Sequence, residues 1–206
     1  MEYQEDTNGT LRQFTTNQRG IKTDWGVSVN GILTSLEYDI ALTRGSGNEI
    51  LSKGNPHLFS GRVGTPSYRN FITGISWFFG DVLGLNGITQ RESLGFDASY
   101  YYYQWQFMVE TSVGKTANNN TVNSFGEILW KNAQENISTY LQVGYQRTKA
   151  NEEVSKRKNS TSYWLAGIQW VSYNGFDISA QYKHKLKGPS TINIDPVLNV
   201  QFRYRM

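Results

Sequence analysis

Eight charged side chains are the candidates for a functional surface, because each alternates with apolar residues in a segment that has the periodicity of a β-strand. They are Arg62, Arg203, Arg205, Lys183, Glu37, Asp39, Asp97 and Glu110. Guanidinium groups stay charged and bind phosphate in a bidentate geometry, so the arginines would attract anionic solutes. Alternatively, the arginines pair with Glu110, Asp97 or Glu37 and neutralise a polar interior. Both interpretations stay open from the sequence.

Catalysis finds little support among the same residues. A glycosidase needs two carboxylates on either side of a bound sugar, and nothing beyond Asp97 and Glu110 suggests such a site. His57 and His184 lie in different segments and form no recognisable nucleophile–base pair. A metal site usually needs three or four ligands, and the chain has no cysteine. The sequence therefore predicts no enzyme, no metal site and no cofactor.

The segments that must position these side chains alternate with a period of two residues. The carboxyl-terminal segment shows this most clearly, with Leu198, Val200 and Phe202 on one face and Asn199 and Gln201 on the other. Eleven such segments are centred near residues 26, 37, 61, 75, 97, 109, 127, 142, 167, 180 and 200. Those near 61, 75 and 127 are the least regular. No amphipathic helix interrupts them, so we expect an all-β antiparallel meander.

The connections between the segments suggest two different ends of the sheet. Short connections are expected at Asn30-Gly31, 65–70, Tyr103, 131–136 and 172–175, and the intervening ones at 45–56, 83–92, 115–121, 151–159 and Gly188-Pro189. We interpret these as a strict alternation of short and long. Barrels of the bacterial outer membrane have tight turns at the periplasmic end and longer loops outside.

The composition excludes some classes and favours a membrane barrel over a soluble sandwich. A chain of 206 residues with 38% hydrophobic residues and a net charge of +3 is neither a disordered polyelectrolyte nor a strongly basic nucleic-acid binder. The segments are long enough for the about 9 to 11 residues that an outer-membrane strand needs. Aromatic residues lie near the segment ends, as interfacial anchors do. These are Trp25, Trp105, Trp130, Trp164, Trp170, Tyr100, Tyr102 and Tyr173.

The odd number of segments predicts an incomplete barrel. Bacterial single-chain barrels have an even number of strands, and the segment from Glu2 to Thr10 is too polar to be a lipid-facing twelfth strand. We therefore interpret 1–18 as a polar N-terminal segment in a loop, and 19–206 as the carboxyl-terminal portion of a larger transmembrane β-barrel. An unpaired edge is costly in lipid, so another chain or further copies are expected to complete it.

A series of short motifs runs through the chain in a fixed order. They are Arg19-Gly20, Tyr38 to Arg44-Gly45, Gly61-Arg62-Val63, Gly95-Phe96-Asp97-Ala98, Glu110, and the amphipathic strand from Val197 to Met206. In this order the chain resembles the carboxyl-terminal half of the phosphate-selective porin O/P-like family of outer-membrane barrels. The resemblance implies a barrel of about 16 strands. Met206 departs from the terminal Phe of such barrels.

The function expected from these features is passive diffusion through a porin-like channel in the bacterial outer membrane. Its solutes would be small and hydrophilic, with anionic, phosphate-like ones as one option. Its surroundings would be outer-membrane lipid and lipopolysaccharide, with no nucleic acid. A structural barrel or sheath that encloses a partner protein is the alternative. The third interpretation is a soluble β-rich binding protein.

Overall fold

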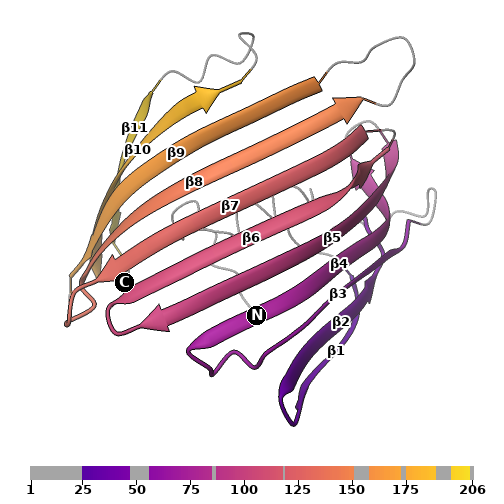
Figure 1. Cartoon of the computed structure of the whole chain (residues 1–206), viewed down its shortest axis with the longest axis horizontal. Helices are drawn as coiled ribbons and strands as arrows, with labels where there is room; N and C mark the ends of the chain where they lie inside the picture. The colour runs from indigo at the N-terminus through magenta and orange to yellow at the C-terminus, as the bar shows by residue number, and fades with distance from the viewer. Residues whose placement is uncertain are drawn as a thin grey trace.

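One continuous antiparallel sheet of eleven strands makes up the structure, a computed structural model that describes residues 25–46, 56–84, 87–117, 119–150, 158–172, 175–188 and 196–204. Each strand pairs with its neighbours in sequence, so the sheet is a meander from β1 to β11 (Figure 1). The strands are β1 (Gly26–Leu33), β2 (Leu36–Thr43), β3 (Leu58–Gly64), β4 (Phe71–Gly84), β5 (Gly87–Tyr102), β6 (Trp105–Thr116), β7 (Asn119–Lys131), β8 (Ile137–Ala150), β9 (Lys158–Val171), β10 (Phe176–Lys187) and β11 (Val197–Tyr204). The expected all-β antiparallel meander and its eleven segments are confirmed.

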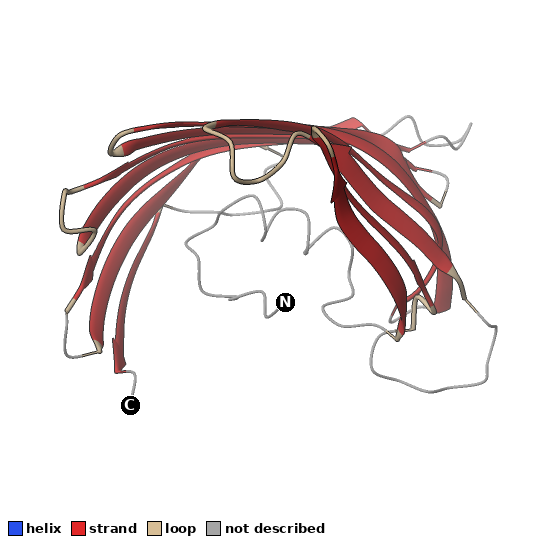
Figure 2. Ribbon diagram, turned by 90° about the horizontal axis from the view of Figure 1, so that it is seen from below, coloured by secondary structure: helices blue, strands red, loops and turns tan. Residues whose placement is uncertain are grey.

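The sheet is curved and open. Figure 2 shows it as a trough whose two limbs bend toward the same side, and β1 does not pair with β11. The described residues contain no helix, and hence none of the length and hydropathy that crossing a bilayer requires. The predicted N-terminal loop at 1–18 lies outside the described residues.

Strand register places every other side chain on the same face of this trough. One face, called the outer face here, carries Leu94 and Phe96 of β5, and the opposite inner face carries Ser93 and Asp97. Leu94 and Phe96 are 51% and 50% exposed, whereas the inner residues are half-buried. Side chains on a concave surface converge and cover one another, so the inner face is the concave one.

The expected strict alternation of short and long connections is wrong. Strand β4 ends at Gly84 and β5 begins at Gly87, so the predicted loop at 83–92 is mostly strand. Strands β6 and β7 are likewise separated by only residues 117–118. The polar residues there misled the prediction, because strands that extend beyond an apolar band keep pairing through polar side chains.

The first hairpin also turns later than predicted. Asn30 and Gly31 lie inside β1, and the turn is made by Thr34 and Ser35. Thr34 adopts a φ of 54°, as do Tyr103 and Glu135 at φ values of 50° and 55° in two other turns at this end. Thr34 and Tyr103 stand in two-residue turns, where a left-handed residue matches the twist of the hairpin.

Among the described residues, four glycines are covered by an aromatic ring from the residue directly opposite on an adjacent strand. The pairs are Gly31–Tyr38, Gly61–Trp77, Gly144–Tyr163 and Gly167–Tyr140. A Cβ on Gly61 would lie 2.5 Å from the Trp77 ring, and one on Gly31 would lie 2.9 Å from the Tyr38 hydroxyl. The ring therefore occupies the space of the missing side chain and stabilises one strand register over its neighbours.

Candidate functional site

Seven of the eight predicted side chains share the inner face. The register connects Asp39 to Arg62, Glu37 to Asp97 through two glycines, and Asp97 to Glu110. Lys183 reaches the same face through Leu165 and Gln142, and Arg203 lies opposite inner Asp177. Arg205 lies outside the described residues. The meander thus places charges from β2, β3, β5, β6, β10 and β11 on one surface.

One row of paired residues crosses this surface from β2 to β10. It reads Glu37, Gly64, Gly74, Asp97, Glu110, Phe125, Gly144, Tyr163 and Lys185. Three carboxylates stand in its first half and one ammonium stands at its far end. The three intervening glycines provide room for the side chains beside them.

Arg62 uses that room to reach Asp97 across β4. Its Nε donates to Oδ1 at 2.9 Å and its Nη2 to Oδ2 at 2.5 Å, which is a bidentate ion pair. Between them, a Cβ on Gly74 would lie 2.5 Å from Nη2. This contact is one of the carboxylate pairings that the alternative interpretation of Arg62 names. Arg62 is therefore not an isolated cation that awaits an anion.

The other carboxylates near Arg62 have different surroundings. Glu37 accepts a hydrogen bond at 2.5 Å from the backbone N–H of Ser67, in the turn between β3 and β4. Asp39 lies directly opposite Arg62 in the register, and Glu110 lies opposite Asp97. Arg62 is thus one cation among several carboxylates, since Asp97, Glu37 and Glu110 all attract its guanidinium electrostatically.

A buried carboxylate that sequence reasoning missed lies on β7. Glu127 is only 4% exposed, and its Oε2 accepts a hydrogen bond from Nε2 of Gln142 on β8. Strand β7 was among the least regular segments because it carries Phe125 and Leu129 on the same inner face as Glu127. Trp130 lies on the outer face opposite Trp105, which puts Glu127, three residues earlier, on the inner face. The expected anchoring role of Trp130 was the sequence signal that could have placed Glu127.

Strands β8 to β10 continue the inner face with tyrosines and lysines. The Tyr140 hydroxyl donates to Oε1 of Gln181 at 3.3 Å. The Lys183 ammonium lies 4.3 Å from the centre of the Tyr163 ring, a distance at which a cation is attracted to the ring face. Each tyrosine also covers a glycine of the adjacent strand, so this part of the wall is densely packed.

Charge is unevenly distributed over the inner face. Carboxylates dominate on β2 to β7, with Glu37, Asp39, Asp97, Glu110 and Glu127. Strands β10 and β11 instead carry three cations, Lys183, Lys185 and Arg203, and one carboxylate, Asp177. The cations Arg62, Arg91 and Lys131 also lie on the inner side of the first limb, where Arg62 is paired with Asp97 and Lys131 lies 3.7 Å from Glu135. The first limb, taken here as β2 to β7, therefore carries a negative net charge on its inner face. The second limb, β10 and β11, carries a positive one.

The residues considered for catalysis are placed differently. Asp97 forms a bidentate ion pair with Arg62. His184 lies on the outer face of β10, with its ring stacked at 6.5 Å on Tyr182 and 6.1 Å from Trp164. His57 precedes β3, where its carbonyl accepts a bond from the Asp81 N–H. In the described part of the chain, no group of three or more His, Asp and Glu side chains is placed to hold a metal ion.

Comparison with known proteins adds no family to this description. No protein-family model and no curated protein matches the chain.

Proposed function

We propose that the chain forms part of the wall of a bacterial outer-membrane β-barrel, and that the barrel is a porin-like channel for small hydrophilic solutes. The inner face would line the water-filled path, and the outer face would meet lipid. Outer-membrane lipid and lipopolysaccharide are then the surroundings, as the resemblance to phosphate-selective porins implies.

The observation that carries this proposal is the inverted distribution of polarity. The outer face exposes a continuous set of apolar side chains, Val27, Val29, Leu42, Phe59, Ile75, Phe79, Leu94, Phe96, Val109, Val113, Ile128, Leu141, Val143, Ile168, Leu198, Val200 and Phe202. The inner face buries charged and amide groups such as Glu127 and Gln142, beside apolar ones such as Phe125. A soluble sandwich would bury the apolar set against a second layer, whereas a membrane barrel leaves it facing lipid.

Solute selectivity would follow from the charges of the two limbs. On β10 and β11 the inner-face cations Lys183, Lys185 and Arg203 outnumber the single carboxylate Asp177, so they are the candidates for attracting anions such as phosphate. The carboxylates of the first limb oppose a purely anion-selective path. We therefore propose a weak preference for anions, carried by Lys183 and Arg203.

Planar-bilayer recording tests the channel directly. Protein purified in detergent should produce discrete conductance steps, and the reversal potential in a salt gradient should give the ion preference. Changing Lys183 and Arg203 together to Glu should shift that potential toward cations, because two positive charges of the path become negative. Absence of any conductance would refute the channel.

Lys149→Glu is the matched control for this charge change. Lys149 is exposed at the outer side of β8, opposite Asn120 in the register. The same reversal of charge there lies away from the proposed path and should leave the reversal potential unchanged. An equal shift in both variants would show that Lys183 and Arg203 have no special role.

The second candidate is a structural barrel or sheath around a partner protein, and the open edges favour it. Strands β1 and β11 each have a neighbour on one side only. Strand β1 contains no charged residue and no proline, so it lacks the usual protection of an edge. In lipid its unpaired backbone groups would be costly, so a further stretch of polypeptide should pair with both edges.

Strand direction constrains that complement. Strands β1 and β11 are both odd-numbered in an antiparallel meander, so they run in the same direction. Two copies inserted in the same orientation, with β11 of one against β1 of the other, would meet with parallel strands. An odd number of additional strands keeps every pair antiparallel. The mass of the complex extracted in mild detergent tests this: a single closed 206-residue chain would refute the need for a complement.

A further inference from the structure

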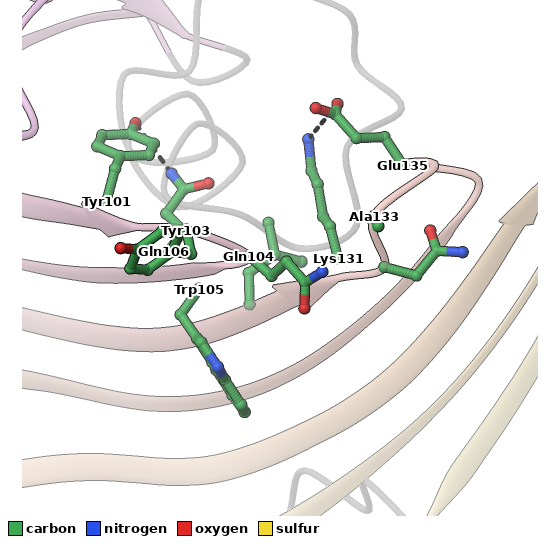
Figure 3. Close-up of a pocket in the computed structure, with 10 residues that line it drawn as sticks. Tyr101, Tyr103, Gln104, Trp105, Gln106, Lys131, Ala133 and Glu135 are labelled. Atoms are coloured by element: carbon green, nitrogen blue, oxygen red, sulfur yellow. Dashed lines mark hydrogen bonds and ion pairs between the residues drawn. The ribbon is translucent and has the colours of Figure 1, made fainter.

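A pocket of about 350 Å³ opens where the hairpins β5–β6 and β7–β8 turn (Figure 3). Three successive strands contribute Tyr101, Gln106 and Leu129, which are register neighbours on the inner face. The β7–β8 turn adds Asn132 and Glu135, among the residues that line the pocket. The pocket therefore lies on the inner wall at the tight-turn end of the trough.

The groups in this pocket are held in place by their own contacts. Nε2 of Gln106 donates to the Tyr101 hydroxyl at 3.0 Å. Lys131 extends toward Glu135, with Nζ and Oε2 separated by 3.7 Å, and Figure 3 shows both on the same side of the strands as Tyr101. In the turn below, the Asn132 side chain donates to Oδ1 of Asn136 at 2.6 Å and accepts from the Ile137 N–H. The turn is thereby fixed next to the pocket.

The chemistry of the lining narrows the class of ligand. A site for an anion would need an excess of positive charge. Lys131, the lysine among the lining residues, faces the Glu135 carboxylate, so the pocket is close to neutral. The amides of Gln106 and Asn132 already hydrogen-bond to Tyr101, Asn136 and the Ile137 N–H. A purely apolar ligand would still cover the Gln104 amide without bonding to it. Each amide offers both donors and an acceptor. Hydroxyl groups, which both donate and accept, match such a lining.

We infer that this pocket binds a neutral saccharide. The ring of Tyr101 offers an apolar face to the C–H side of a sugar ring, while the amides, Lys131 and Glu135 would bond its hydroxyls. The volume lies at the lower end of that of ligand pockets, which suits one or two rings of a longer saccharide. The inference deepens the proposed channel and rests on it for its role, since a site at the mouth would select saccharides among the solutes.

Titration calorimetry with maltotriose and cellotriose, on the full chain in detergent, tests the binding without requiring conductance. At least one trisaccharide should release or absorb heat in a saturable way. Tyr101→Ala should weaken that binding at least roughly tenfold, and Tyr101→Phe should weaken it less, because the ring face remains. Gln106→Ala provides an independent weakening if Tyr101→Ala fails to fold.

Tyr100→Ala is the matched control. Tyr100 is the preceding residue on β5 but lies on the outer face, where it stacks on Phe107 and Tyr102. Its loss should leave trisaccharide affinity unchanged. Equal affinity in the wild type and Tyr101→Ala would overturn the inference, as would binding of inorganic phosphate at this site that is lost in Lys131→Ala.

A bilayer recording separates this inference from the channel itself. Maltotriose added from one side should reduce the ion current of the wild type more than that of Tyr101→Ala. A conducting protein with no trisaccharide heat and no reduction of current overturns the saccharide site and leaves the channel standing. A protein that binds trisaccharide but never conducts refutes the channel and leaves the pocket.

Discussion

Arg62 lies flat across β4 because Gly74 beneath it has no side chain. The guanidinium donates two charge-assisted hydrogen bonds to Asp97, and such bonds are stronger than those between neutral groups. Both side chains are at most a third exposed, so water screens the pair incompletely. The wall charge of the first limb is therefore partly neutralised by a contact that joins three strands.

Gly74→Ala should break this contact. The new Cβ would stand where the guanidinium lies, so we expect the free energy of unfolding to fall by roughly 1 kcal/mol. Gly126→Ala is the control, because its Cβ would meet the nearest atom of Val143 at an ordinary 3.5 Å. Urea unfolding of both variants in the same detergent measures the difference. A loss of stability of the same size in Gly126→Ala would assign the effect to strand glycines in general.

At this scale the sequence predicts which face a charge occupies but not which partner it has. Alternation is enough to place Asp97 and Arg62 together on the inner face. Their contact depends on the register of two strand pairs and on the glycine between them, and neither is visible in a local pattern. Glu127 was missed for a related reason, since its strand mixes large apolar and polar residues on one face.

Hairpins determine the order of the elements, and the turn between β1 and β2 carries backbone strain. Thr34 is β-branched and has a φ of 54°, a conformation that Asn and Gly adopt more easily. We expect Thr34→Asn to raise the free energy of unfolding by roughly 1 kcal/mol. Thermal unfolding followed by circular dichroism measures it, with Ser35→Asn as the control at the neighbouring turn position. A gain in Ser35→Asn but not in Thr34→Asn would contradict this explanation.

The elements themselves were largely predictable from alternation, whereas their ends were not. Period-two patterns located all eleven strands because one face of each is apolar. The β4–β5 and β6–β7 hairpins extend beyond the apolar band with residues such as Gln90, Glu92 and Lys115, which resemble loop residues in a one-dimensional pattern. Pairing with the opposite strand, rather than side-chain type, keeps these ends extended.

For the whole molecule, the decisive property is which face of the trough meets an apolar environment. Leu94→Arg places a charge on the outer face, and at the middle of a bilayer this should cost about 2 to 4 kcal/mol. Ser93→Arg adds the same charge one residue earlier, on the inner face. We expect only Leu94→Arg to lose refolding into lipid vesicles, measured by protection from protease. Equal refolding of both would contradict a lipid-facing outer surface.

The rings that cover Gly144 and Gly167 also have a consequence for the shape of the hollow. Because Tyr163 and Tyr140 lie over glycines, their rings rest against the backbone instead of standing upright on it. The side chains along β8 and β9 therefore project less from the sheet than upright tyrosines would. In the proposed channel, a solute passing there would meet ring faces rather than ring edges, with the Lys183 ammonium 4.3 Å from the centre of the Tyr163 ring.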